Sequence, residues 1–153
     1  MPAPIRIWLE TTHHSAFRYG GWAYVREADG ALTGAAGGER NITPGRLELS
    51  AMIAALNGLA VGSTAALYVS SASLLAIGRM IADPPAPADA PTEDLDLWAQ
   101  LLAAAKGRAV SFRAAPASTF LLAWAEVGQD KAKAAGRFSA AIPKPNLAKF
   151  KPA

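Results

Sequence analysis

The sequence predicts an α/β domain in which a mixed five-stranded sheet, three antiparallel strands followed by parallel additions, is flanked by helices. Residues 5–40 contain three strand-like segments joined by turn signals, which is typical of an antiparallel meander. Residues 43–135 alternate helix-like and strand-like segments, which is typical of parallel strands with helical cover. Of the 153 residues, 52% are hydrophobic and 18% charged, which suits one packed domain and excludes global disorder.

The meander is expected to begin with a strand over residues 5–10, where apolar and polar residues alternate. Residues 11–19 are polar and contain both histidines, so we expect a loop there. A second strand is predicted over residues 22–27, followed by Asp29-Gly30, a favoured two-residue hairpin turn. Residues 31–40 form the third predicted strand, weakened by glycines.

Four helices and two further strands are expected in the rest of the chain. The first helix begins at Thr43-Pro44, because threonine caps free backbone N–H groups and proline is tolerated in the first helical turn. The helices are predicted over residues 43–62, 71–81, 93–106 and 120–135, and the strands over residues 65–70 and 109–113. We expect the four tryptophans, which lie in apolar settings, to belong to the core.

The charges are distributed unevenly along the chain. Residues 83–96 carry five acidic side chains and no basic one, whereas from Lys131 onward there are six basic side chains and no acidic one. This asymmetry predicts an anionic partner for the C-terminal end, with a solubilising role as the equal alternative. The last fifteen residues contain three prolines and three lysines, so we expect a domain over 1–138 and a mobile basic tail over 139–153.

Several classes of protein are not expected. No apolar run reaches the ~18 residues of a membrane span, and the first residues do not have the pattern of a signal peptide. Cysteine is absent, which excludes disulfides and thiolate metal sites. We therefore expect a cytoplasmic protein without a membrane partner.

Two acidic residues and a pair of serines follow the predicted elements in a recognisable pattern. Glu10 ends the first strand, Glu48 lies in the first turn of the first helix within Arg-Leu-Glu-Leu, and Ser70-Ser71 ends the fourth strand. With the Gly20-Gly21-Trp22 segment, these motifs resemble type I ribonuclease H over residues 5–136. The matching residues of the helix motif are Thr43, Arg46, Leu47, Glu48 and Leu49.

The resemblance implies the ribonuclease H fold and endonucleolytic hydrolysis of RNA in RNA/DNA hybrids. In that family four carboxylates hold two Mg²⁺ or Mn²⁺ ions, which activate water and stabilise the leaving oxygen. By resemblance, Glu10 would bridge the metals, Glu48 would bind one of them, and Asp130, or alternatively Glu126, would be the fourth carboxylate. Ser70 occupies the third position, and because a neutral hydroxyl is a weak Mg²⁺ ligand, we expect hydrolysis to be weak or lost.

The expected nucleic-acid contacts come from the same resemblance. Arg18, Arg46 and Thr43 would contact the substrate by position. His13 and His14 would contact phosphate or bind Mn²⁺ or Zn²⁺ in a rescued site, with a solvated loop as the favoured alternative.

Two functions therefore remain open. One is a divergent metal-dependent ribonuclease H; the other is a noncatalytic module that retains the fold and binds nucleic acid or a protein partner. The acidic segment 83–96 stands where many family members have a basic protrusion and would repel a phosphate backbone. Nucleic acid, if bound, would therefore be held differently from the family's usual mode.

Overall fold

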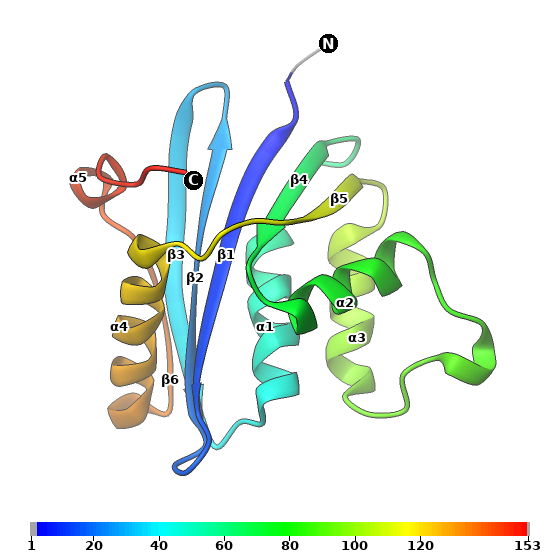
Figure 1. The fold of residues 1–153 in the computed structure, drawn as a ribbon, viewed down its shortest axis with the longest axis horizontal. Coiled ribbons are helices and arrows are strands. Elements are labelled where there is room, and N and C mark those ends of the chain that lie inside the picture. Colours follow the sequence, from blue (N-terminus) through cyan, green and yellow to red (C-terminus); the bar gives the residue numbers. More distant parts are fainter. Residues whose placement is uncertain (1–2, 153) are drawn as a thin grey trace.

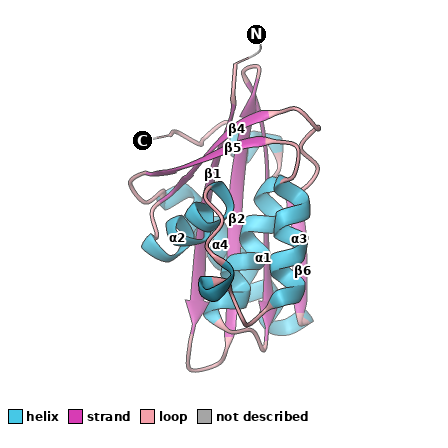
Figure 2. Ribbon diagram, turned by 90° about the vertical axis from the view of Figure 1, so that its right-hand side faces the viewer, coloured by secondary structure: helices cyan, strands magenta, loops and turns pink. Residues whose placement is uncertain are grey.

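A computed structural model describes residues 3–152 of the chain as one mixed sheet with helices on both faces (Figures 1 and 2). The strands are β1 (Ile5–His14), β2 (Tyr19–Ala28), β3 (Ala31–Arg40), β4 (Thr64–Val69), β5 (Ala109–Ala114) and β6 (Arg137–Ala141). The α-helices are α1 (Pro44–Leu56), α2 (Ala72–Ala82), α3 (Leu95–Ala105), α4 (Thr119–Ala135) and the short α5 (Lys144–Leu147). A 3-10 turn, η1 (Pro87–Asp89), interrupts the proline-rich loop between α2 and α3.

The sheet confirms the predicted mixed topology and adds a sixth strand. Its order is β5-β4-β1-β2-β3-β6. Strands β1, β2 and β3 form the antiparallel meander, and β4 and β5 are added in parallel beside β1. The extra strand, β6, pairs antiparallel with β3.

The first hairpin is longer than expected. His13 pairs with Gly20 and His14 with Tyr19, so only residues 15–18 remain as the turn. The polar composition of this stretch resembled a loop, but residues 11–14 continue β1 and pair with β2. Three of these four residues are half-buried, and polar side chains are tolerated in such a partly solvated antiparallel pair.

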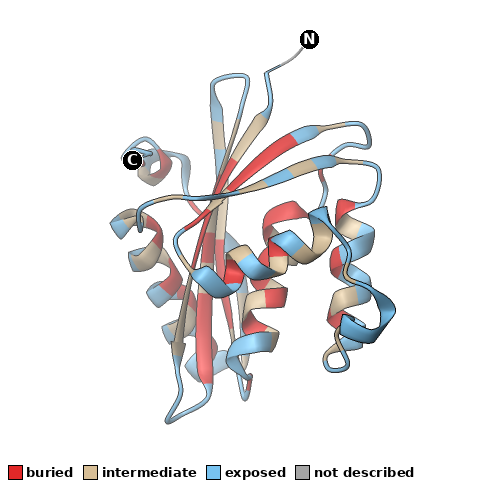
Figure 3. Ribbon diagram, turned by 45° about the vertical axis from the view of Figure 1, so that its right-hand side comes forward, coloured by how far each residue is buried: buried red, intermediate tan, exposed pale blue. Residues whose placement is uncertain are grey.

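The two faces of the sheet carry separate hydrophobic clusters, as Figure 3 shows by the red inner sides of the helices and central strands. One cluster lies under α1, α2 and α3 and includes Ile7, Leu9, Met52, Leu67 and Leu101. The other lies under α4 and the C-terminal segment and includes Trp8, Val25, Leu121, Leu147 and Phe150. Successive residues of β1 therefore point to opposite cores.

Glycines explain how closely α4 approaches the meander. A side chain at Gly21 would overlap the backbone of Ala125 in α4, and one at Gly128 would overlap the backbone of Gly37 in β3. The glycines that weaken β3 as a strand thus allow a helix to lie directly on it.

Residues 139–150 pack against the sheet, which corrects the expected mobile tail over 139–153; residue 153 lies outside the described residues. The first residues of this segment pair with β3 as part of β6, and Ile142, Leu147 and Phe150 are buried against the sheet. Apolar residues spaced among the lysines and prolines anchor the segment, so the domain continues beyond residue 138. No helix within residues 3–152 is long and apolar enough to cross a membrane.

Candidate functional site

The candidate site is centred on Glu10, the one buried charged residue of the described chain, with 6% of its surface exposed. Its position in β1 places it on the same sheet face as Trp8. The hydroxyl of Ser70, at the end of β4, donates to Oε1 at 2.6 Å and lies 3.0 Å from Oε2. The backbone of Ser118 is also near enough to this carboxylate to lower its pKa.

Burial and hydrogen bonding shift the pKa of Glu10 in opposite directions. Burial raises its pKa above the ordinary value because a buried carboxylate loses water, and the hydrogen bond from Ser70 and the backbone of Ser118 lower it in part. Burial is the larger effect, so the net direction is upward.

Ser118 places the start of α4 at this site. Its side chain accepts a hydrogen bond from the backbone N–H of Leu121 at 3.2 Å, so Ser118 is the N-cap of α4. Two serines, Ser70 and Ser118, thus surround Glu10 from the ends of two different elements.

Glu48 is bound by hydroxyls from the same serine-rich segment. The Ser73 hydroxyl donates to Glu48 Oε2, and the hydroxyls of Ser71 and Ser73 lie 2.8 Å apart. Ser71 also caps α2 by accepting from the backbone N–H of Leu74 at 3.3 Å. The segment from Ser70 to Ser73 therefore supplies a hydroxyl partner to each of the two candidate carboxylates.

Asp130 is not brought to this pair. It lies on the exposed side of α4, twelve residues beyond the N-cap Ser118, which corresponds to about 18 Å along a helix. The alternative, Glu126, is eight residues beyond the same cap, or about 12 Å. The start of α4 holds Ser118 and Thr119, so no carboxylate stands at the end of the helix nearest Glu10.

The donor set does not fit the two-metal arrangement that the resemblance implied. Within residues 3–152, no three histidine, aspartate or glutamate side chains gather closely enough to hold one metal ion. Mg²⁺ prefers several hard, charged oxygen ligands. Here the third position is a neutral hydroxyl, which adds no negative charge to that of Glu10.

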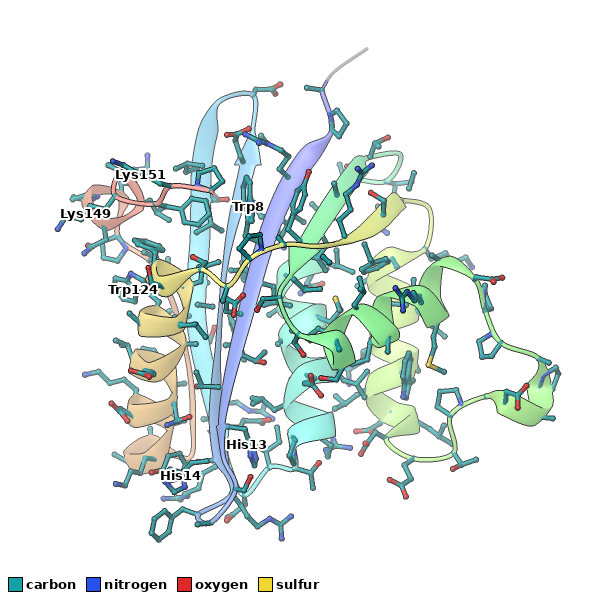
Figure 4. The ribbon with its side chains drawn as sticks, in the orientation of Figure 1. Trp8, His13, His14, Trp124, Lys149 and Lys151 are labelled. Atoms are coloured by element: carbon teal, nitrogen blue, oxygen red, sulfur yellow. The ribbon has the colours of Figure 1, made fainter. Side chains whose placement is uncertain are left out.

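The two histidines lie further along β1 than Glu10 and contact other parts of the chain. Figure 4 shows both of them far from Trp8. His13 is three residues further along β1, about 10 Å away along the strand, and its Nε2 lies 2.8 Å from the carbonyl oxygen of Ile42. Its Nδ1 is buried without a hydrogen-bond partner among the described residues. His14 stacks with Tyr19 in the hairpin, at a centroid distance of 5.2 Å.

The expected nucleic-acid contacts on α1 also have partners within the chain. Arg46 donates to Asp94 Oδ1 at 2.9 Å and to both carboxylate oxygens of Asp96 at 2.9 and 3.0 Å. These hydrogen bonds lower the pKa of Asp96 to about 2 and raise that of Arg46. Thr43 caps α1, and Arg18 lies exposed in the first hairpin turn with a positive φ of 54°. Acidic residues of the segment 83–96 thus bind Arg46, the residue that was expected to contact phosphate.

The structure also shows an aromatic surface beside Glu10 that the sequence did not indicate. The rings of Trp8 and Tyr68 stack at a centroid distance of 5.5 Å, and Arg6 lies 5.0 Å above Trp8. Phe150 contacts the other side of Trp8 at 5.1 Å. Cross-strand pairing of β1 with β4 creates the stack, and no local motif signals it.

No protein-family model matches the chain. No curated protein matches it either. Among solved structures, the N-terminal ribonuclease H domain of Rv2228c from Mycobacterium tuberculosis is similar, with a TM-score of 0.68, 17% identity, and coverage of 86% of this chain and 97% of that one. LC11 ribonuclease H1, solved in complex with an RNA/DNA hybrid, is also similar, with a TM-score of 0.66, 16% identity, and coverage of 84% and 99%. The chain therefore has the ribonuclease H-like fold.

Proposed function

We propose that this protein binds nucleic acid through a ribonuclease H-like fold without performing two-metal hydrolysis. The observation that carries the proposal is the set of serine contacts around Glu10: Ser70 and Ser118 occupy the strand end and helix start where charged ligands would be needed. A buried glutamate whose carboxylate accepts hydrogen bonds from a serine hydroxyl is a satisfied structural group.

The loss of charge bears directly on catalysis. Two divalent cations bring four positive charges, and four carboxylates balance them in the arrangement that the resemblance implies. Glu10 and Glu48 supply at most two negative charges, and each already has a serine hydroxyl as a partner. Asp130 lies too far along α4 to contribute.

The charge distribution supports the binding part of the proposal. All six lysines lie in the C-terminal part of the chain, from Lys106 onward, and none forms a salt bridge with an acidic side chain of the described residues. Lysines without an acidic partner attract polyanions and give binding that weakens with salt. The hybrid bound to LC11 ribonuclease H1 shows that a similar fold accommodates such a ligand.

The test combines a binding assay and a cleavage assay on the same fluorescent RNA/DNA hybrid. We expect the wild-type protein to bind hybrid or single-stranded nucleic acid with an affinity that falls as salt rises, and to release no cleavage product in Mg²⁺ or Mn²⁺. Ser70→Asp should give no cleavage either, because the carboxylate at the start of α4 is also missing.

Two results would contradict the proposal. Cleavage by the wild-type protein that disappears in Glu48→Gln would show that the two carboxylates still carry the hydrolysis. Absence of binding to single-stranded, duplex and hybrid substrates at low salt would exclude the nucleic-acid role.

A further inference from the structure

Half of one sheet face is left without a covering helix. Helix α4 packs on β2 and β3, while β4 and β5 on the same side face a groove. Strand pairing aligns Trp8 with Tyr68 and Tyr68 with Arg113, so these three residues form a row across β1, β4 and β5. The row lies one step from Glu10 and Ser70, because side chains two residues apart in a strand share a face.

The groove over this half-face has a volume of about 560 Å³. Its floor includes Trp8 and Tyr68, and its walls are the loop from Ala114 to Thr119 and the terminal residues from Lys149 to Pro152. Phe150 holds the terminal wall in place, because its buried ring packs against Trp8 and Phe120. The segment that was expected to be a mobile tail thus forms one wall of the groove.

The chemistry of the groove combines aromatic rings with positive charge. Tyr68 and Phe120 are half-buried rings that line it, and Arg6, Lys149 and Lys151 supply the charged groups (Figure 4). None of the described residues that line it is acidic. Among the cations that line the groove, Arg6 is paired with Glu27 at 2.8 Å, which leaves the two lysines for a ligand.

We propose that this groove binds single-stranded nucleic acid, with bases against the rings of Tyr68 and Phe120 and phosphates beside Lys149 and Lys151. The proposal rests on the proposed function and names the surface that performs it. Aromatic platforms flanked by cations bind unpaired bases, whose faces are free, whereas the bases of a duplex stack on one another. A helical duplex therefore gains less from such a groove than a single strand does.

The test measures the anisotropy of a labelled oligothymidylate of about 12 nucleotides, a length within the range of single-strand sites. The variant Lys149→Glu/Lys151→Glu should weaken binding on the order of tenfold or more and reduce the slope of log affinity against log salt by about 1.4, the value for two phosphate contacts on a single strand. The matched control Lys106→Glu/Lys131→Glu changes the net charge equally outside the groove, and we expect a loss below about threefold.

Tyr68 gives a second, uncharged test. Tyr68→Leu should weaken binding about tenfold through lost stacking, whereas Tyr68→Phe keeps the ring and should bind like the wild type. Circular dichroism and thermal melting establish that each variant is folded.

The outcomes separate this inference from the proposed function. Equal losses in the two double-lysine variants, or unchanged binding by Tyr68→Leu, would overturn the groove while leaving nucleic-acid binding intact. Failure of the wild-type protein to bind single-stranded, duplex or hybrid ligands would instead overturn the proposed function. Binding weakened by the groove variants and spared by the controls supports both.

Discussion

Replacing Phe150 with alanine should release the C-terminal segment and destabilise the protein. The residue is 5% exposed, and its ring centroid lies 5.1 Å from that of Trp8 and 5.5 Å from that of Phe120. Burial of a phenylalanine removes roughly 150–250 Å² from water, which at about 25 cal/mol per Å² gives an upper value of about 4–6 kcal/mol.

The measured loss should be smaller, because Phe150 belongs to a segment that docks on the sheet through only a few buried side chains. The terminal segment can detach while the rest of the sheet stays folded, so the loss cannot exceed the free energy that docks this segment. We therefore expect Phe150→Ala to lower the free energy of unfolding by about 2–3 kcal/mol, which for a domain of this size lowers Tm by roughly 4–12 °C.

The assay is thermal unfolding followed by circular dichroism, with limited proteolysis of the C-terminal segment beside it. Phe17→Ala is the matched control, because Phe17 is 67% exposed and its loss should cost less than about 1 kcal/mol. A Phe150→Ala protein that melts within about 2 °C of the wild type, with an equally protected C-terminus, would refute the docked segment and the groove that it walls.

Three further predictions follow from contacts at the site and beneath α4. Burial raises the pKa of Glu10 in the folded state, so the stability that Glu10 contributes falls as pH rises through its raised pKa. Glu10→Gln should therefore be more stable than the wild type at pH 8, and this advantage should shrink toward pH 4. The opposite trend in urea unfolding would contradict the assignment. Arg46 lowers the pKa of Asp96 from 3.8 to about 2, so the pair stabilises the fold above pH 3.8 and loses this effect as pH falls toward 2. Arg46→Ala should remove this pH dependence of the unfolding free energy. A pH profile identical to that of the wild type would exclude the pair. Gly128→Ala should lower the free energy of unfolding by about 1–3 kcal/mol, because the added methyl overlaps the backbone of Gly37; unchanged urea unfolding would show that α4 does not lie directly on β3.

The parts of the fold that could be predicted are those with strong local signals. Asp29-Gly30 forms the expected turn, with φ values of 52° and 80° that suit a two-residue hairpin loop. Thr43 caps α1 as expected, since a cap depends on a contact only three residues away. The edge strand β6 has no such signal: four of its five residues are exposed, so no apolar alternation marks it.

The site was predictable only in part, for a related reason. Glu10 and Glu48 were found because they belong to a recognisable motif, although β1 continues past Glu10 to His14 and does not end there as expected. Their partners Ser70 and Ser73 are separated from them by 60 and 25 residues, and only the folded sheet brings them together. The expected role of Asp130 depended on where the last helix begins, and the cap at Ser118 places that acid three turns away.

The positive charges available to bind phosphate lie on a different surface from the one that the family resemblance implied. Arg46, on the α1 side where the resemblance placed the substrate, is bound by two acids of the segment 83–96, so little charge remains there for phosphate. Lys149 and Lys151 lie on the α4 side of the sheet, where no helix covers β4 and β5. The groove lies next to Glu10 on the same sheet face, but the further carboxylates that two metal ions require are missing beside it. The lysines favour phosphate binding, and the serine-bound carboxylates do not favour cleavage. The groove, rather than α1, is therefore the surface where we expect nucleic acid to bind.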